Sequence, residues 1–345
     1  MKKYSIGING LRGLFALIIV LFHFELFYSF GEYKIFSSGY FAVEFFFILS
    51  GFLICKNFIQ KDKKSISEAI ASKVKKMYPA YILALFALIS VYVAKWYNFN
   101  YILWLKQTPN NIKLLTESLM LQSTGISNFK SINGPSWYVS SLIVNTGIII
   151  GLLKIFKKFR KVTFLIITCL IYSYFYFNHY SMSPNYFVYY IFSSAVLRGL
   201  AGMSLGALTC LITIDLSKKI NNFPQKLFNL LEITLFVGLL SLLILHDPGK
   251  SNYFILVISS ILIMLLFSKD GIIDKLFHFK FLQFFGNISF EFYIFQSACS
   301  NFVICFLPQL KQPYATITYL FINLTIATLV YLIYNKLILR RKNEV

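Results

Sequence analysis

Residues 10–30 read GLRGLFALIIVLFHFELFYSF, an apolar stretch that is interrupted by Arg12, His23 and Glu25. A run of this length crosses the ~30 Å hydrocarbon core of a bilayer when it is helical. No small-residue cleavage signature follows it, so we interpret it as a retained transmembrane helix and not as a signal peptide. This first stretch sets the fold class, because similar stretches recur along the whole chain.

The composition agrees with a membrane protein: 57% of the 345 residues are hydrophobic, 19% are aromatic and only 13% are charged. The sequence predicts an all-α, polytopic transmembrane helical bundle, with a single membrane domain over residues 1–345 and no appended soluble domain. About ten spans are expected, at residues 10–30, 39–59, 78–97, 136–153, 162–178, 191–213, 229–245, 253–267, 285–307 and 315–338.

Ten crossings bring both termini to one side, and the basic residues indicate which side that is. Arg12 and Arg198 lie within spans. All but seven of the other lysines and arginines fall on the side of the termini; the seven are Lys34, Lys95, Lys106, Lys113, Lys130, Lys250 and Lys311. Because cytoplasmic loops carry the excess of basic residues, we expect both termini in the cytoplasm.

The formal net charge of +20 would favour nucleic acid as the partner of a soluble domain. Here the basic residues lie between apolar spans, so membrane orientation explains them and nucleic-acid binding is disfavoured. The four histidines, His23, His179, His246 and His278, are scattered over different segments, and no CxxC pair is present. No metal site is therefore expected.

Ionisable groups inside spans are costly, by ~2.5–3.5 kcal/mol each at a helix centre, and often functional. Arg12 and His23 are eleven residues apart, which is about three helical turns, so both project from one face ~16 Å apart along the axis. An anionic part of a substrate would lie near Arg12, and its reactive part near His23. A histidine there can act as a general base, although a structural histidine with a snorkelling arginine fits the spacing equally well.

A carboxylate partner for His23 has two nearby candidates. Glu25 is only two residues away and points elsewhere on the helix. Glu44, from the second span, is therefore the favoured catalytic partner.

The sequence also resembles a known family. Its opening block, residues 9–16 followed by His23, resembles acyltransferase family 3, the integral-membrane acyltransferases that modify bacterial surface carbohydrates. Four further blocks are similar to that family in the same order: residues 39–54, with Glu44 where aspartate is common; 73–81, a basic pair before a proline; 135–140, a tryptophan block; and 285–294, a glycine-serine-tyrosine block.

The resemblance implies a multi-pass protein of the bacterial cytoplasmic membrane that passes an acyl group, usually acetyl from cytoplasmic acetyl-CoA, to a carbohydrate hydroxyl presented from the outer side. The acceptor would be a carbohydrate, lipid-linked or not. By this resemblance His23 is the catalytic histidine, and Arg12, Lys73 and Lys76 hold the phosphates of the donor. A basic cluster at the cytoplasmic surface supports the last assignment, since a multiply charged CoA must dock there.

Three departures from the family pattern bear on mechanism. Lysines replace the usual arginines at 73 and 76, so phosphates would be held by point charges and not by bidentate forks. Leu142 and Gln296 stand where many members have a glutamate and a histidine, so neither missing group is the acid or base here.

The acceptor side has weaker candidates. Trp137 and Tyr138 would stack on a sugar or serve as interfacial aromatics. Arg198 and Glu291 are intramembrane charges assigned to binding the acceptor, and for Arg198 pairing with another charge is the alternative. The residue that would donate a hydrogen bond to the oxyanion is open among Ser50, Ser140 and Tyr293.

Residues 202–206, GMSLG, fit a nucleophile-elbow pattern but lie within an apolar helix, so close helix packing is the favoured interpretation.

Two other functions remain open. A transporter or flippase of a lipid-linked saccharide also carries intramembrane charges, but it predicts internal repeats that we do not find. A membrane acyltransferase of the unrelated membrane-bound O-acyltransferase type also uses an intramembrane histidine, but it is not expected to open with this arginine-histidine helix.

Overall fold

The computed structural model describes residues 5–27, 35–60, 65–107, 111–125, 131–178, 182, 187–188, 192–245 and 249–343. All nine residues to which the sequence assigns a site role lie within these ranges. Two parts of the polar segment 98–135, residues 108–110 and 126–130, lie outside them, as do His179 and His246.

Among the described residues, nine helical segments are long and apolar enough to cross a membrane. They are α1 (Gly7–Glu25), α2 with the short helix η1 before it (Gly39–Gln60), α3 (Ile66–Tyr97), α6 with η2 (Gly134–Ile155), α7 (Arg160–Asn178), α8 (Ser194–Asn221), α9 (Gln225–Ile244), α10 with η3 (Lys250–Ser268), and residues Tyr314–Lys336 of α14 (Tyr314–Asn343). The all-α polytopic class is confirmed, and nine of the ten expected spans correspond to these segments.

The tenth expected span, 285–307, is divided between the end of α12 (Lys280–Asn287) and α13 (Ser289–Phe306). Helix α13 is not among the nine apolar segments. Glu291, Gln296 and Asn301 make its sequence more polar, and most of its residues are buried against other helices. A helix that is shielded from lipid by its neighbours tolerates such side chains.

The remaining elements are short. They are α4 (Tyr101–Gln107), α5 (Asn111–Ser118) and α11 (Ile272–Leu276), together with β1 (Phe187–Val188) and β2 (Phe192–Ser193), which pair as a two-stranded antiparallel sheet.

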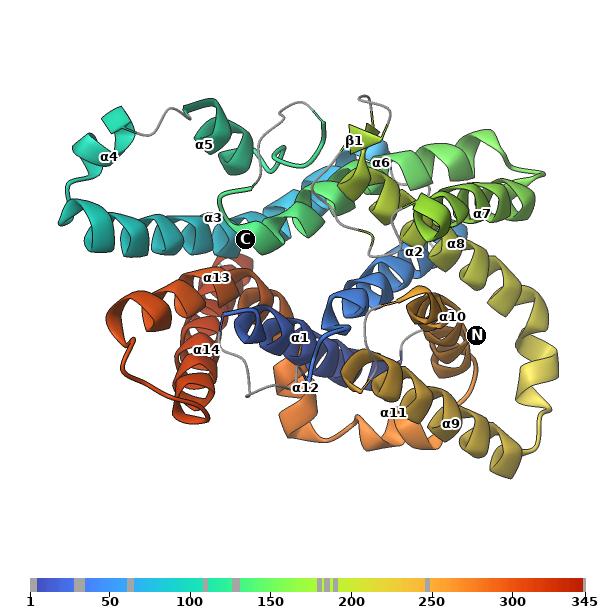
Figure 1. Cartoon of the computed structure of the whole chain (residues 1–345). Helices are drawn as coiled ribbons and strands as arrows, with labels where there is room; N and C mark the ends of the chain where they lie inside the picture. Colours follow the sequence, from blue (N-terminus) through green and yellow to red (C-terminus); the bar gives the residue numbers. More distant parts are fainter. Residues whose placement is uncertain are drawn as a thin grey trace.

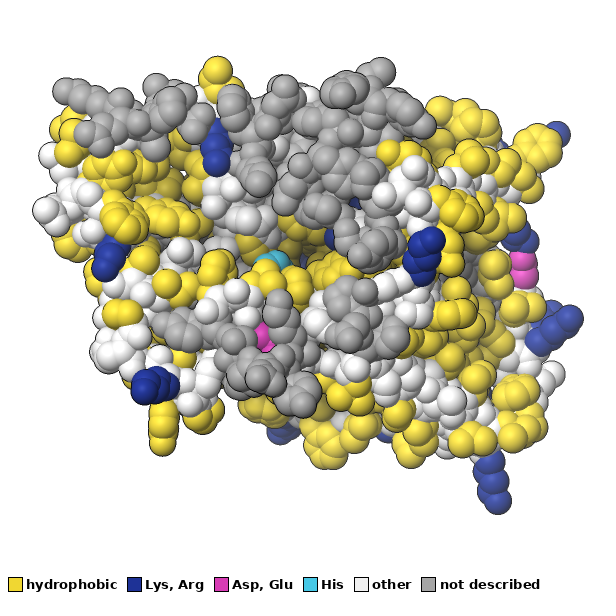
Figure 2. All heavy atoms as spheres, in the orientation of Figure 1, with side chains coloured by type: hydrophobic (Ala, Val, Ile, Leu, Met, Phe, Trp, Pro, Cys, Tyr) yellow, Lys and Arg dark blue, Asp and Glu magenta, His cyan; other side chains and the backbone are white. Residues whose placement is uncertain are grey.

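Helix α1 lies near the middle of the bundle (Figure 1). It packs against α2, α12 and α13, while α3 and α14 flank α13 and the pair α2 and α8 forms the other half of the core. Large apolar side chains such as Phe86, Leu170 and Phe321 are exposed on α3, α7 and α14. Figure 2 shows hydrophobic side chains reaching the edge of the molecule on most sides, as expected for a surface that contacts lipid.

Helix α3 begins twelve residues before the predicted span at 78–97. Ser65 and Glu68 form a reciprocal capping box, in which Ser65 Oγ accepts from the Glu68 amide at 3.1 Å and Glu68 accepts from the Ser65 amide at 2.9 Å. This cap starts the helix at Ile66, and Pro79 is accommodated inside it. As a result Lys73 and Lys76 are helical residues and not loop residues.

Part of the polar segment 98–135 is fixed to the helical bundle by one buried carboxylate. Glu117, on α5, accepts hydrogen bonds from Ser136 Oγ at 2.6 Å and from the Ile132 amide at 3.0 Å. Tyr81 on α3 donates to the Glu117 carbonyl at 2.8 Å. These bonds tie α5 to α3 and to the start of α6.

Helices α2 and α8 approach each other at their glycines. A Cβ atom added to Gly51 would lie 1.9 Å from the carbonyl oxygen of Met203, and one added to Gly206 would lie 1.9 Å from that of Ile48. The close-packing interpretation of the GMSLG segment is therefore confirmed, because no side chain fits at these positions.

We predict that Gly206→Ala lowers stability by about 1–3 kcal/mol, because the added methyl forces α2 and α8 apart. Gly238→Ala is the matched control, since a Cβ at this other helical glycine meets nothing within 4 Å. Thermal unfolding of the purified protein in detergent measures both. Equal midpoints for the two variants would contradict the close approach.

Candidate functional site

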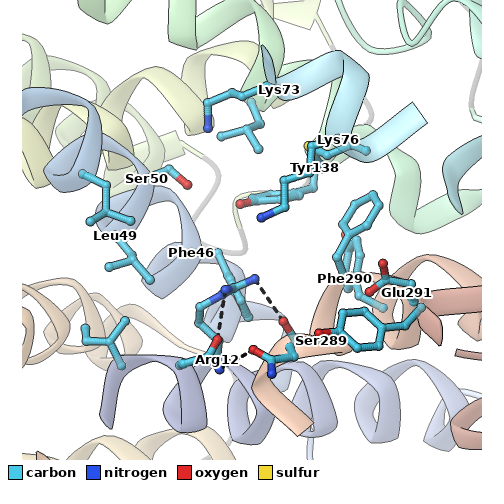
Figure 3. A pocket seen from close by; sticks show the side chains of 18 of the residues that line it. Arg12, Phe46, Leu49, Ser50, Lys73, Lys76, Tyr138, Ser289, Phe290 and Glu291 are labelled. Atoms are coloured by element: carbon cyan, nitrogen blue, oxygen red, sulfur yellow. Dashed lines mark hydrogen bonds between the residues drawn. The ribbon is translucent and has the colours of Figure 1, made fainter. Parts of the chain in front are cut away.

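A cavity of about 490 Å³ opens between α1, α2, α3, α6, α13 and α14, with one lining residue each from α10 and α12. Its polar part is lined by Arg12, Lys73, Lys76, Tyr138 and Glu291, and its apolar part includes Val43, Phe46 and Leu49 of α2. Figure 3 shows Lys73 and Lys76 entering the cavity from the side opposite Arg12. Three cations that are up to 64 residues apart in the sequence therefore meet in one space.

The helical periodicity of α3 explains why Lys73 and Lys76 line the cavity and Lys75 does not. Lys73 and Lys76 are three residues apart, so they project from the same face of the helix. Lys75 lies on another face, is exposed, and is not among the lining residues. Had residues 66–77 been a loop, this separation of the lysines would not follow.

Arg12 is held in position by α1 itself and by the start of α13. Its Nη1 donates to Asn9 Oδ1 at 3.3 Å and its Nη2 donates to Ser289 Oγ at 3.2 Å. Asn9 in turn donates to Asn287 Oδ1 at 2.7 Å and to the Gln283 carbonyl at 3.0 Å, which fastens α1 to α12. The guanidinium is thus aimed into the cavity by a polar network (Figure 3).

The charge in the cavity is unbalanced. Among the described residues that line it, the cations Arg12, Lys73 and Lys76 are accompanied by one carboxylate, Glu291. Like charges brought together in a partly apolar space repel each other strongly, so an arrangement of this kind favours binding of an anion with several negative charges.

His23 lies on α1 one turn beyond Ile19, which is the last α1 residue to line the cavity. Its Nδ1 is 2.8 Å from the Ile19 carbonyl oxygen. Because a carbonyl oxygen only accepts, Nδ1 carries the hydrogen of the neutral ring and Nε2 keeps its lone pair. The imidazole is half-buried, and the side chain of Gln296 on α13 lies beside it.

The predicted pairing of Glu44 with His23 is not observed. Glu44 and Arg198 form a fully buried ion pair, with 0% and 2% of their side chains exposed. Tyr172 donates to the other carboxylate oxygen at 2.6 Å, and the Arg198 guanidinium also donates to the carbonyls of Met182 and Tyr40, both at 3.0 Å. A charge inside the bundle is most stable beside an opposite charge, and Arg198 supplies it.

Trp137 and Arg198 do not line the cavity, contrary to what a shared acceptor site would require. The Arg198 guanidinium lies over the Trp137 ring, 4.9 Å from its centroid, so these two residues are packed on each other. Tyr138 and Glu291 do line the cavity, together with Arg12, Lys73 and Lys76. Of the four predicted acceptor residues, Tyr138 and Glu291 therefore lie in the cavity. Arg198 belongs to the buried ion pair with Glu44, and Trp137 packs on Arg198.

Sequence reasoning missed Asn9 and Ser289 as ligands of Arg12, although both lie inside the quoted family blocks. It left Gln296 without a role. The available signal was position: Asn9 precedes Arg12 by three residues, which places both on one helical face. No signal in the sequence pairs Ser289 or Gln296 with α1, because that contact depends on how α13 packs.

No group of three His, Cys, Asp or Glu side chains suited to a metal ion occurs in the part of the chain that the structure describes.

We predict that Glu44→Ala lowers stability by about 3–5 kcal/mol, because it leaves the Arg198 cation buried without its partner. Asp215→Ala is the control, since it removes the carboxylate of the exposed Lys161–Asp215 pair, in which 52% of each side chain is accessible, and it should cost no more than about 1 kcal/mol. Thermal unfolding in detergent compares the two. Wild-type unfolding of Glu44→Ala would show that the ion pair does not have this structural role.

Comparison with known proteins supports the family resemblance. No curated protein and no solved structure matches the chain. The model of a family described as an acyltransferase domain matches residues 5–334, nearly the whole chain. The match includes α1 with Arg12 and His23, the lysines of α3 and the whole of α13. The chain therefore belongs to acyltransferase family 3, the membrane acyltransferases.

Proposed function

We propose that this acyltransferase moves an acyl group, acetyl in the first instance, from cytoplasmic acyl-CoA to a hydroxyl of a cell-envelope carbohydrate. It would do so in the bacterial cytoplasmic membrane, with both termini in the cytoplasm. The observation that carries the proposal is the convergence of Arg12, Lys73 and Lys76 in one cavity whose α1 wall leads toward His23.

The cavity suits the donor for two reasons. Its cations match the phosphates of CoA, which are the only strongly anionic part of an acyl-CoA. Its apolar wall, formed by residues such as Val43, Phe46 and Leu49, suits the uncharged arm that carries the thioester. The arm would then run along α1 past Ile19, a distance of ~16 Å from Arg12 to His23 along the helix axis.

His23 would act as the general base. Its Nε2 takes the proton of the acceptor hydroxyl while the hydroxyl oxygen forms a bond to the thioester carbon. When the resulting tetrahedral intermediate collapses, the carbon–sulfur bond breaks, and the imidazolium returns the proton to the departing thiolate. The products are the ester and free CoA, and no other reactant is needed.

We predict that purified His23→Ala protein loses acyl transfer by ~10²–10⁴-fold while still binding CoA, because only the base is removed. Acetyl-CoA and the glycan fraction from cells that lack the gene are the substrates, and mass spectrometry of the glycan measures the acetyl groups added. Transfer by the variant at the wild-type rate would eliminate the mechanism.

The phosphate role has its own test. Lys73→Ala and Lys76→Ala should each weaken acetyl-CoA binding by roughly 10- to 100-fold, because each removes a charged hydrogen-bonding group worth about 1.5–3 kcal/mol. Lys75→Ala is the matched control on the same helix, and its affinity should equal that of the wild type. Dissociation constants are measured by calorimetry in detergent, and similar losses in all three variants would point to general surface charge.

A transporter of an unmodified saccharide is the competing function. We predict that CoA at 100 times its dissociation constant stabilises the enzyme by ~2.7 kcal/mol against thermal unfolding. A transporter would show neither this stabilisation nor acetylated glycan, so the absence of both would overturn the proposed function.

A further inference from the structure

Gln296 is an unusual side chain for the interior of this bundle. It is only 1% exposed and interacts with the His23 ring, but neither its amide oxygen nor its amide nitrogen reaches hydrogen-bond geometry with a residue that the structure describes. A buried amide whose hydrogen-bonding groups are not satisfied is costly, at about 1–3 kcal/mol. Such a group is retained at a functional site when a ligand supplies the missing partner.

The packing of α1 and α13 fixes where the Gln296 amide lies. The two helices are in contact and run in the same direction, since Ser289 near the start of α13 bonds Arg12, and Gln296 further along lies beside His23. In Figure 1 they lie next to each other near the centre of the bundle. The amide is therefore at the same end of this helix pair as the imidazole.

The cavity leads to the same place along both helices. Its last residue on α1 is Ile19, four residues before His23, and its last residue on α13 is Tyr293, three residues before Gln296. About one turn beyond the cavity wall, α1 therefore carries His23 and α13 carries Gln296. A thioester that passes Ile19 and Tyr293 would arrive between the imidazole and the amide.

The other candidate oxyanion donors are less well placed than Gln296. Tyr293 donates its hydroxyl hydrogen to the Pro135 carbonyl at 2.6 Å, and Ser140, whose Oγ accepts from the Ser123 amide at 3.2 Å, is not among the residues that line the cavity. Ser50 lines the cation cavity on α2, and its hydroxyl interacts with Tyr138. Of these groups and Gln296, only the Gln296 amide lies beside His23, and neither its oxygen nor its nitrogen reaches hydrogen-bond geometry with a described residue.

We propose that Gln296 is a catalytic residue whose Nε2–H donates a hydrogen bond to the thioester carbonyl oxygen as that oxygen becomes negative. The inference rests on the proposed function. In the transfer step the acceptor oxygen bonds to the carbonyl carbon, its proton goes to His23 Nε2, and the carbonyl π electrons move to the oxygen held by Gln296. When the carbon–sulfur bond breaks, the carbonyl re-forms and the Gln296 hydrogen bond weakens. Stabilisation that is strongest in the transition state raises kcat.

The test compares two variants of the full-length enzyme in detergent. Gln296→Met has a similar volume but no donor, and kcat should fall ~10²–10³-fold, with KM for acetyl-CoA within about threefold of the wild type. Gln296→His keeps an N–H donor at this position and should recover much of the lost kcat. Both use acetyl-CoA and the glycan fraction from cells that lack the gene.

Thermal unfolding without substrate separates this role from a structural one. Replacing a buried amide whose hydrogen bonds are not satisfied by an apolar side chain should leave the unfolding midpoint of Gln296→Met unchanged or raise it. A lower midpoint together with lower activity in both variants would assign Gln296 a structural role and overturn the proposal. Wild-type kcat in Gln296→Met would also overturn it.

The failure of this inference is distinguishable from failure of the proposed function. If the wild type transfers acetyl groups, His23→Ala does not and Gln296→Met does, then only the Gln296 assignment is wrong. If the wild type transfers none, or His23→Ala is fully active, the proposed function itself fails.

Discussion

The cost of placing charge among apolar helices decides how this protein is built. The bundle answers that cost in two ways. Glu44 and Arg198 neutralise each other, and Tyr172 and two backbone carbonyls complete their hydrogen bonds. Arg12, Lys73 and Lys76 instead share a cavity with one carboxylate, Glu291. The first arrangement holds α2 and α8 together, and the second leaves an excess of positive charge where an anionic ligand binds well.

The contact between α1 and α13 connects the cavity to the chemistry we propose. Near the beginning of this pair, Ser289 steadies Arg12, and toward its other end Gln296 lies beside His23. Helix α13 is more polar than the nine apolar segments, and its burial against α1, α3 and α14 is what allows it to carry Glu291 and Gln296. A lipid-facing helix with the same side chains would be unstable.

The structure shows where the residues that depart from the family pattern lie and what each contributes there. Leu142 belongs to the apolar lining of the cavity, so position 142 adds no further carboxylate to Glu291 near the cations. Lysines at 73 and 76 give flexible point charges in place of rigid forks, which suits a cavity whose walls come from several helices. Gln296 offers a neutral amide beside His23, so the imidazole has no second titratable group from that position.

The sequence by itself determined the fold class, nearly all of the spans and the common face of Arg12 and His23, because each depends on helical periodicity within one segment. The sequence also contains the capping box of Ser65 and Glu68, although the span prediction overlooked it. This cap starts α3 early enough for Lys73 and Lys76 to lie on one face of the helix. Only the tertiary structure decided that Glu44 pairs with Arg198, that Trp137 packs on Arg198 and that Gln296 lies beside His23. Those pairings depend on which helices become neighbours and how far each is shifted along its axis, and no single-segment pattern contains that information.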